Sequence, residues 1–245
     1  LYKPRAVEQA VRRAMYGAAG YARGSYAAAS RAGELVYACR EQAAALFSVG
    51  EPERVIFTLN ATHALNIAIN ALVKPDSRVI VSGYEHNAVM RPLTARNIEP
   101  TVLDTPLWDG AAMISALKQA LVQGADLMIL SHVSNVFGSI APLDEIAELL
   151  TAAGVPLILD ASQSAGVAEI DVKRYPCLAA VCMPGHKALY GPMGTGILLA
   201  LDDRIAAKPP LDPRCRAHSA CRSRAHPAEN PADAAPRTDC PFLRS

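Results

Sequence analysis

The sequence predicts an α/β fold in which a mainly parallel sheet is flanked by helices in three layers. Short apolar runs of strand length alternate with stretches of helical periodicity between residue 31 and about residue 201. Strand alternating with helix is typical of a largely parallel sheet that is covered on both faces. The chain has 245 residues, 51% of them hydrophobic, which is enough for one sizeable core.

The helices are predicted from apolar periodicity and from end signals. Residues 31–47 place Leu35, Cys39, Ala43 and Leu46 near one face of an amphipathic helix. Further helices are expected over 63–72, 111–122 and 143–153. Acidic residues favour the start of the last of these, and Gly154 favours its end.

Seven short apolar runs, several rich in β-branched residues, are predicted as strands. They cover residues 55–59, 78–82, 100–103, 127–131, 156–160, 178–183 and 196–201. In such sheets ligands collect at the carboxyl ends of the strands. The candidate functional residues below all lie at strand ends, and we therefore expect a single site.

Two regimes of composition divide the chain. Residues 1–204 are predicted to form one domain, whereas from about residue 208 the sequence becomes rich in Pro, Arg, Ala, Cys and Asp, without periodicity. The segment 205–245 is therefore expected to be a poorly ordered tail, because it offers little apolar surface to offset its chain entropy.

Charge and composition also exclude some classes of function. A formal net charge of +1 gives no basis for binding nucleic acid or an anionic membrane. No apolar run approaches the roughly 20 residues that span a bilayer. No signal-peptide pattern precedes the first helix-like segment, so a cytoplasmic location is expected.

The six cysteines show no CxxC spacing and are expected to be free thiols. Cys215, His218, Cys221 and His226 lie close together, but their spacing matches no common zinc finger. We therefore predict no metal site.

Lys187 is the central candidate. It follows the apolar run 178–183 and precedes a glycine-rich turn, 191–196. Asp160 ends another apolar run, with Gln163 close behind. A lysine can form a Schiff base with an aldehyde cofactor, and a buried aspartate can pair with a pyridinium nitrogen. A surface lysine beside an ordinary turn is the alternative, but acid, amide and lysine in this order favour a pyridoxal 5′-phosphate site.

Three further positions are candidates with simpler alternatives. Ala61 and Thr62 follow Asn60 at a helix N-terminus, which can bind an anion or can be no more than a helix cap. His86 could stack on a flat ring and move protons, or be a hydrogen-bonded structural residue. Asn135 could hold a phenolic oxygen, or be an ordinary loop residue. The P-loop pattern and the GxGxxG pattern of nucleotide sites are both absent.

Five segments, taken in order, resemble those of the class V pyridoxal-phosphate enzymes. They are NATHALN (60–66), EHNAV (85–89), SHVSNVFG (131–138), LDASQSAG (159–166) and PGHKALYGPMGTG (184–196). The closest likeness is to the cysteine desulfurase branch, including the bacterial subgroup with a PGHK lysine motif. The resemblance extends over nearly all of residues 1 to about 203.

This resemblance implies a type I aminotransferase fold, a homodimer and roles for eight residues. By motif position, Lys187 would form the Schiff base, Asp160 would pair with the pyridine nitrogen, Gln163 would contact the ring hydroxyl, His86 would stack on the ring, Ala61, Thr62 and His186 would hold the phosphate, and Asn135 would lie near the substrate and the ring oxygen.

The implied reaction converts L-cysteine to L-alanine. Cysteine displaces Lys187 from the cofactor, Lys187 shuttles protons, and a mobile enzyme thiolate attacks the substrate sulfur to form a persulfide. A sulfur-acceptor protein would then collect the sulfur. The alternatives are another class V reaction, such as selenocysteine lyase, kynureninase-like cleavage or transamination, and a non-catalytic remnant.

The chain also departs from the family pattern. Pro184 stands where many relatives have a phosphate-binding serine, and His63 where a glutamate is common. We expect the family's opening strand to be missing, as well as the small domain that carries its substrate-binding arginine and persulfide cysteine. The tail differs from the family, so no role passes to its cysteines. This leads to the hypothesis of a frame change near Lys208 or a truncated gene copy.

Overall fold

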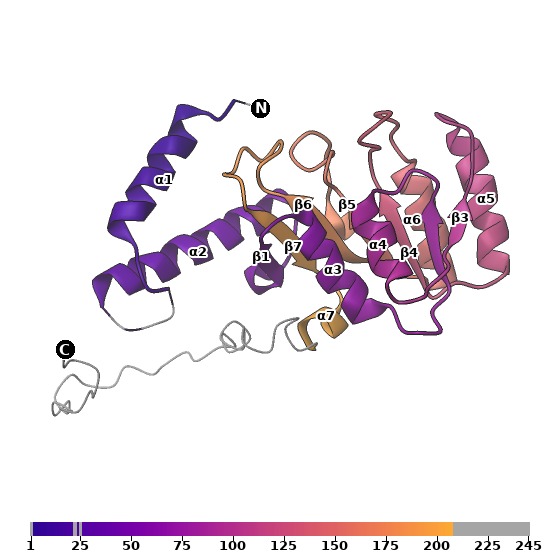
Figure 1. Ribbon diagram of the computed structural model, residues 1–245, viewed down its shortest axis with the longest axis horizontal. Coiled ribbons are helices and arrows are strands. Elements are labelled where there is room, and N and C mark those ends of the chain that lie inside the picture. The colour runs from indigo at the N-terminus through magenta and orange to yellow at the C-terminus, as the bar shows by residue number, and fades with distance from the viewer. Residues whose placement is uncertain (1, 22–23, 25, 208–245) are drawn as a thin grey trace. The chain divides into compact units, whose positions relative to one another are not determined.

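The computed structural model describes residues 2–21, 24 and 26–207 (Figure 1). The strands of this part form one sheet, in the order β1-β7-β6-β5-β4-β2-β3. They are β1 (Val55–Thr58), β2 (Val79–Ser82), β3 (Thr101–Leu103), β4 (Leu127–Ser131), β5 (Leu157–Asp160), β6 (Leu178–Pro184) and β7 (Gly196–Ala200).

Seven α-helices and two 3-10 turns accompany the sheet in the described part. The helices are α1 (Arg5–Gly17), α2 (Ala27–Leu46), α3 (Ala61–Leu72), α4 (Asn87–Thr94), α5 (Gly110–Val122), α6 (Leu143–Ala153) and α7 (Asp203–Ala207); the 3-10 turns are η1 (Pro52–Arg54) and η2 (Val172–Arg174). Within the described ranges, every helix is too short or too polar to span a bilayer.

The sheet is parallel except for β7, which is antiparallel to both of its neighbours. Because β7 runs in the opposite direction, its first residue lies at the edge where the other strands end. Gly196 accordingly pairs with Thr58 at the end of β1 and with Pro184 at the end of β6. The predicted mainly parallel sheet is confirmed.

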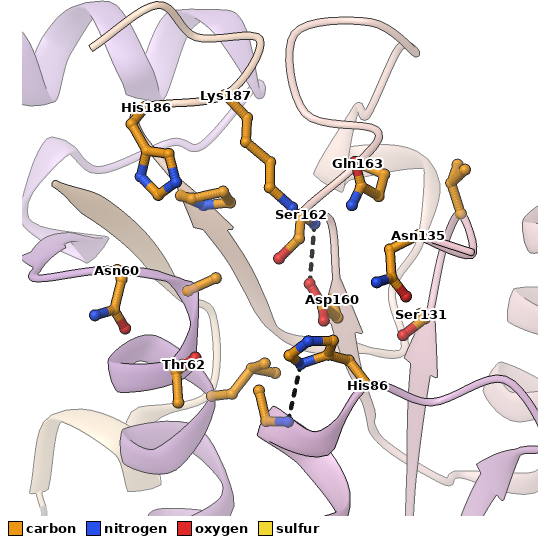
Figure 2. A pocket seen from close by; sticks show the side chains of 15 residues that line it. Asn60, Thr62, His86, Ser131, Asn135, Asp160, Ser162, Gln163, His186 and Lys187 are labelled. Atoms are coloured by element: carbon orange, nitrogen blue, oxygen red, sulfur yellow. Dashed lines mark hydrogen bonds between the residues drawn. The ribbon is translucent and has the colours of Figure 1, made fainter. Parts of the chain in front are cut away.

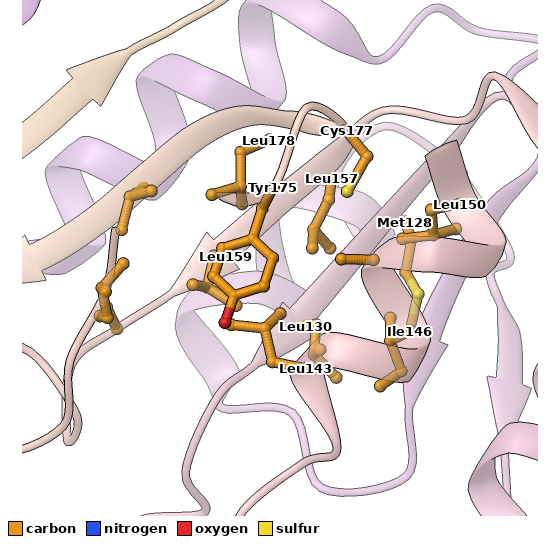
Figure 3. Close-up of a cluster of buried hydrophobic side chains, with 14 of the residues drawn as sticks. Met128, Leu130, Leu143, Ile146, Leu150, Leu157, Leu159, Tyr175, Cys177 and Leu178 are labelled. Carbon is orange, nitrogen blue, oxygen red and sulfur yellow. The ribbon is translucent and has the colours of Figure 1, made fainter. Parts of the chain in front are cut away.

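Side chains alternate across the sheet and form two cores. Along β4, Met128 and Leu130 point to the face covered by α2, α5 and α6, whereas Leu127 and Ile129 point to the face covered by α3, α4 and α7. Figure 3 shows part of the first core, where Ile146 and Leu150 of α6 lie over the sheet. A fully buried leucine contributes about 2 kcal/mol to folding. The three predicted layers are therefore present.

Most predicted boundaries agree with the structure within one or two residues. The larger difference is α2, which begins at Ala27 instead of residue 31. Three helices were not expected: α1, which has no buried residue, α4, which contains Pro92, and the short α7. Residues from 208 onward, including the group Cys215 to His226, lie outside the described part, so the predictions about them stay predictions.

Candidate functional site

One cavity lies at the sheet edge where the parallel strands end (Figure 2). Segments that follow β1, β2, β4, β5 and β6 all contribute side chains to it. The structure brings all eight predicted site residues to this cavity: Ala61, Thr62, His86, Asn135, Asp160, Gln163, His186 and Lys187. Seven further residues line it, among them Ser131, Ser162 and Pro184, which the sequence did not identify as site residues.

The turn from β1 into α3 presents backbone donors at the cavity. Asn60 caps the helix, because its side-chain oxygen accepts a 2.8 Å hydrogen bond from the backbone N–H of His63. The N–H groups of Ala61 and Thr62 belong to the first helical turn and have no partners within the helix. Both residues line the cavity, so the turn combines a cap with a potential anion site.

Gly196 permits this turn to lie against the start of β7. A Cβ atom at residue 196 would come within 2.6 Å of both the carbonyl carbon of Asn60 and the hydroxyl oxygen of Thr58. These contacts are closer than real Cβ atoms allow. The sheet edge and the α3 N-terminus can therefore meet only if residue 196 lacks a side chain.

His86 is both a helix cap and a cavity residue. Its ring Nδ1 accepts a 3.0 Å hydrogen bond from the backbone N–H of Ala88, at the start of α4. Because Nδ1 is an acceptor, a neutral ring carries its proton on Nε2. The ring is held by this hydrogen bond and remains exposed at the cavity.

Asp160 provides a buried carboxylate. Asp160 is 5% exposed, and its Oδ1 accepts a 2.9 Å hydrogen bond from the backbone N–H of Ser162. No ion pair to Asp160 is formed within the described ranges. A buried carboxylate stays ionised at low cost only next to a cation, so this position suits a cationic ligand atom.

The loop after β6 carries His186 and Lys187. Two backbone hydrogen bonds fasten it: Gly185 N–H to Thr195 O, 2.8 Å, and Gly191 N–H to Gly185 O, 2.7 Å. Figure 2 shows the Lys187 side chain extending from this loop into the cavity, on the side where Asp160 lies. The Nδ1 atom of His186 is buried and has no hydrogen-bond partner among the described residues.

Asn135 and Gln163 complete the predicted set on the loops after β4 and β5. Asn135 is exposed and Gln163 is half-buried, and the amide groups of both lie at the cavity (Figure 2). At this position the two amide groups can form hydrogen bonds with a polar substituent of a ligand in the cavity.

These side chains fit pyridoxal 5′-phosphate. The buried Asp160 carboxylate lacks a cation, which a protonated pyridine nitrogen supplies. The unpartnered Nδ1 of His186 and the first-turn N–H groups of α3 are suited to a phosphate group. Pro184 lines the cavity without a side-chain donor, so one contribution expected of the family is absent at that position.

The chain belongs to the class-V aminotransferase family, whose model matches residues 2–225. Enzymes of this family depend on pyridoxal phosphate, so the predicted cofactor is confirmed at the level of the family. The type I fold and the likeness to cysteine desulfurases are confirmed as well.

Individual relatives are consistent with this family. A cysteine desulfurase from Serratia proteamaculans is 30% identical over 205 residues, which are 80% of this chain and 50% of the relative. Cysteine desulfurase IscS from Vibrio cholerae is 35% identical over 175 residues, 69% of this chain and 42% of the relative. The chain thus spans about half the length of the curated relatives that it matches.

A solved structure has the same fold. The apo structure of a cysteine desulfurase from Thermococcus onnurineus superimposes with a TM-score of 0.75 at 24% identity. The match covers 83% of this chain and 52% of that one.

Proposed function

We propose that the chain is a pyridoxal-phosphate-dependent enzyme of the cysteine desulfurase type, which converts L-cysteine to L-alanine and transfers the sulfur to an enzyme thiol. The observation that carries the proposal is that Lys187 and the buried, cation-free Asp160 line one cavity together with His86. The names of the relatives support the reaction class.

Each end of the cavity has a role in holding the cofactor. The α3 N-terminus, at Ala61 and Thr62, together with His186, would bind the phosphate. Asp160 would hold the proton of the ring nitrogen, and the His86 ring would lie against the flat face of the cofactor. Gln163 and Asn135 would contact the ring oxygen. When bound, the cofactor supplies an electron sink for the substrate carbons.

Lys187 would act as the catalytic amine. Its Nζ would hold the cofactor through the aldehyde carbon until the substrate amine takes its place. The freed Nζ would then take a proton from the substrate Cα and return a proton to Cβ, where alanine gains its hydrogen. The narrow loop around Gly185 keeps this amine aimed into the cavity.

The thiol that receives the sulfur is not provided by the cysteines of the described part. Cys39, Cys177 and Cys182 do not line the cavity. Burial, together with the charge of Asp160, holds the pKa of the Cys182 thiol well above its usual range, which suppresses the nucleophilic thiolate. The accepting thiolate therefore has to come from another part of the enzyme.

The proposal extends to the setting of the reaction. By family likeness, we infer a homodimer located in the cytoplasm, with a sulfur-acceptor protein that takes sulfur from the enzyme. Support comes from the match to the class-V family and to named cysteine desulfurases.

Product analysis tests the reaction. The chain is loaded with pyridoxal phosphate and incubated in separate reactions with L-cysteine, L-selenocysteine or L-alanine. A Lys187→Ala variant is treated in the same way. The proposal expects alanine from cysteine with the parent chain and none with the variant. If alanine formed from selenocysteine but not from cysteine, the reaction would be that of a selenocysteine lyase. If pyruvate formed from alanine, the reaction would be a transamination.

A further inference from the structure

Glu85 is a half-buried acid beside the site that the proposed function leaves without a role. It lies in the turn between β2 and α4, directly before His86. Its side chain meets Ser82 and Ser131 at the ends of β2 and β4, and it is not among the residues that line the cavity. Ser131 lines the cavity, so Glu85 lies one residue behind the wall.

Three hydrogen bonds hold the Glu85 carboxyl group. Its Oε1 accepts from the Ser82 hydroxyl at 2.6 Å and from the Ser131 backbone N–H at 2.8 Å. Its Oε2 accepts from the Ser131 hydroxyl at 2.8 Å. These contacts fasten the turn that carries His86 to the end of β4, so the position of His86 depends on Glu85.

The same carboxyl group is electrostatically coupled to Asp160. Ser131 pairs with Asp160 across adjacent strands, and its hydroxyl donates a hydrogen bond to Glu85. Ser131 therefore lies between the two acids. The pKa of Glu85 is raised to about 7: desolvation of the carboxyl group has the largest effect, the hydrogen bonds from Ser82 and Ser131 oppose it, and the charge of Asp160 adds to it. The acid thus changes charge close to neutral pH.

We propose that Glu85 is a positioning residue of the cofactor site, which fixes the His86 turn and, when ionised, strengthens the hold of Asp160 on a cationic ring. This inference rests on the proposed function. A second negative charge near Asp160 favours a cation at the ring nitrogen. By linkage, the cation favours ionised Glu85, so binding of the cofactor releases a proton from Glu85 to solvent.

Other ionisable groups lie near this carboxyl group, and their effects on the pH dependence of binding have to be distinguished from that of Glu85. Asp160 faces it from β5, His86 adjoins it in the same turn, and Lys187 lies across the cavity. Asp104, after β3, approaches the backbone of Gly83. A variant of Glu85 itself is therefore needed to assign a pH effect.

Glutamine is a matched replacement at this position. In a Glu85→Gln variant the amide oxygen can accept from Ser82 and from the Ser131 N–H, as Oε1 does. The amide nitrogen would face the Ser131 hydroxyl, which can accept as well as donate. The variant thus keeps the geometry and removes only the titrating charge.

The test uses pyridoxamine 5′-phosphate, which has the same ring and phosphate but cannot react with Lys187. Calorimetric titrations of the full chain, in two buffers of different ionisation enthalpy and between about pH 6 and 8.5, give the affinity and the number of protons released. The parent chain should release part of a proton on binding, and the release should be largest close to pH 7. Its affinity should gain roughly three- to tenfold over Glu85→Gln as pH rises through this range.

A second variant, Ser82→Ala, keeps the acid but removes a donor that favours the ionised form. It should move the maximum of proton release to higher pH. If the parent chain and Glu85→Gln released the same number of protons and had the same pH profile of affinity, the inference would be wrong. The proposed function would still stand as long as the probe binds. If the folded parent chain did not bind the probe at any pH, the proposed function would fall, and this inference with it.

Discussion

The backbone N–H of Ser162 donates a 2.9 Å hydrogen bond to the carboxylate of Asp160. This is the one hydrogen bond to that carboxylate found in the described part of the chain, and the residue is 5% exposed. A buried anion with one donor and no cation is costly, and the cost is recovered when a cationic ring binds. The affinity of the chain for pyridoxal phosphate should therefore depend on this charge.

Replacing Asp160 with asparagine should weaken pyridoxal phosphate binding by roughly 10- to 100-fold, because a hydrogen bond to a charged group contributes about 1.5–3 kcal/mol. Titration of the cofactor, followed by visible absorbance, measures the change. Asp76→Asn, at an exposed acid in the loop before β2, is the matched control and should bind like the parent chain. Equal affinities for the two variants would contradict the role of Asp160.

Replacing Gly196 with alanine should destabilise the fold by about 1–3 kcal/mol, because the new Cβ would overlap the backbone of Asn60. It should also weaken cofactor binding, since the α3 N-terminus has to move. Urea unfolding measures the first effect. In Gly33→Ala, within α2, the Cβ would meet nothing within 4 Å, and this variant should gain up to about 1 kcal/mol. Similar losses for both variants would refute the packing argument.

The pH dependence of stability should carry the signature of Glu85. Its pKa is about 7 in the folded chain against 4.5 for the free side chain, so the folded state keeps a proton that the unfolded state has lost. The contribution of Glu85 to the free energy of unfolding is fully present below about pH 4.5 and falls as pH rises to about 7. Above that pH the contribution no longer changes. Glu85→Gln should gain about 3 kcal/mol over the parent chain across that window. Urea unfolding at several pH values measures the difference, and a difference independent of pH would be inconsistent with a raised pKa.

Thiol labelling should distinguish Cys182 from Cys39. Cys182 is fully buried, and its pKa is held well above the usual range by burial and then by the charge of Asp160. Cys39 is exposed on α2. Under native conditions at about pH 8, iodoacetamide should modify Cys182 at least tenfold more slowly than Cys39, as peptide mass spectrometry would show. Rapid modification of Cys182 in the folded chain would show that the end of β6 opens.

The sheet could be predicted from the sequence because its strands are short apolar runs between turn signals. The apolar run 127–131, for example, has the same bounds as β4. The helices α1 and α4 could not be predicted in this way. Helix α1 carries apolar residues at helical spacing, Val7, Val11 and Met15, but it buries none of them, so its presence does not follow from core packing. Pro92 inside α4 is a helix-breaking signal.

The positions of the site residues were predicted because chemistry-bearing side chains follow the strands, and parallel strand ends meet at one edge. Glu85 was visible in the sequence, but its partners Ser82 and Ser131 are brought to it only by the pairing of β2 with β4. Likewise, nothing in the sequence near Gly196 indicates its contact with Asn60, which arises because β7 is antiparallel to β1.

The proposed chemistry depends on Lys187 as the amine that binds the cofactor aldehyde. To test this, pyridoxal phosphate is added to the chain, the product is reduced with borohydride, and the modified peptide is mapped by mass spectrometry. We expect a visible absorption band that borohydride abolishes, and a phosphopyridoxyl group on Lys187 that is missing in Lys187→Ala. Attachment to other lysines at equal extent, or no attachment to the folded chain, would show that Lys187 is not this amine.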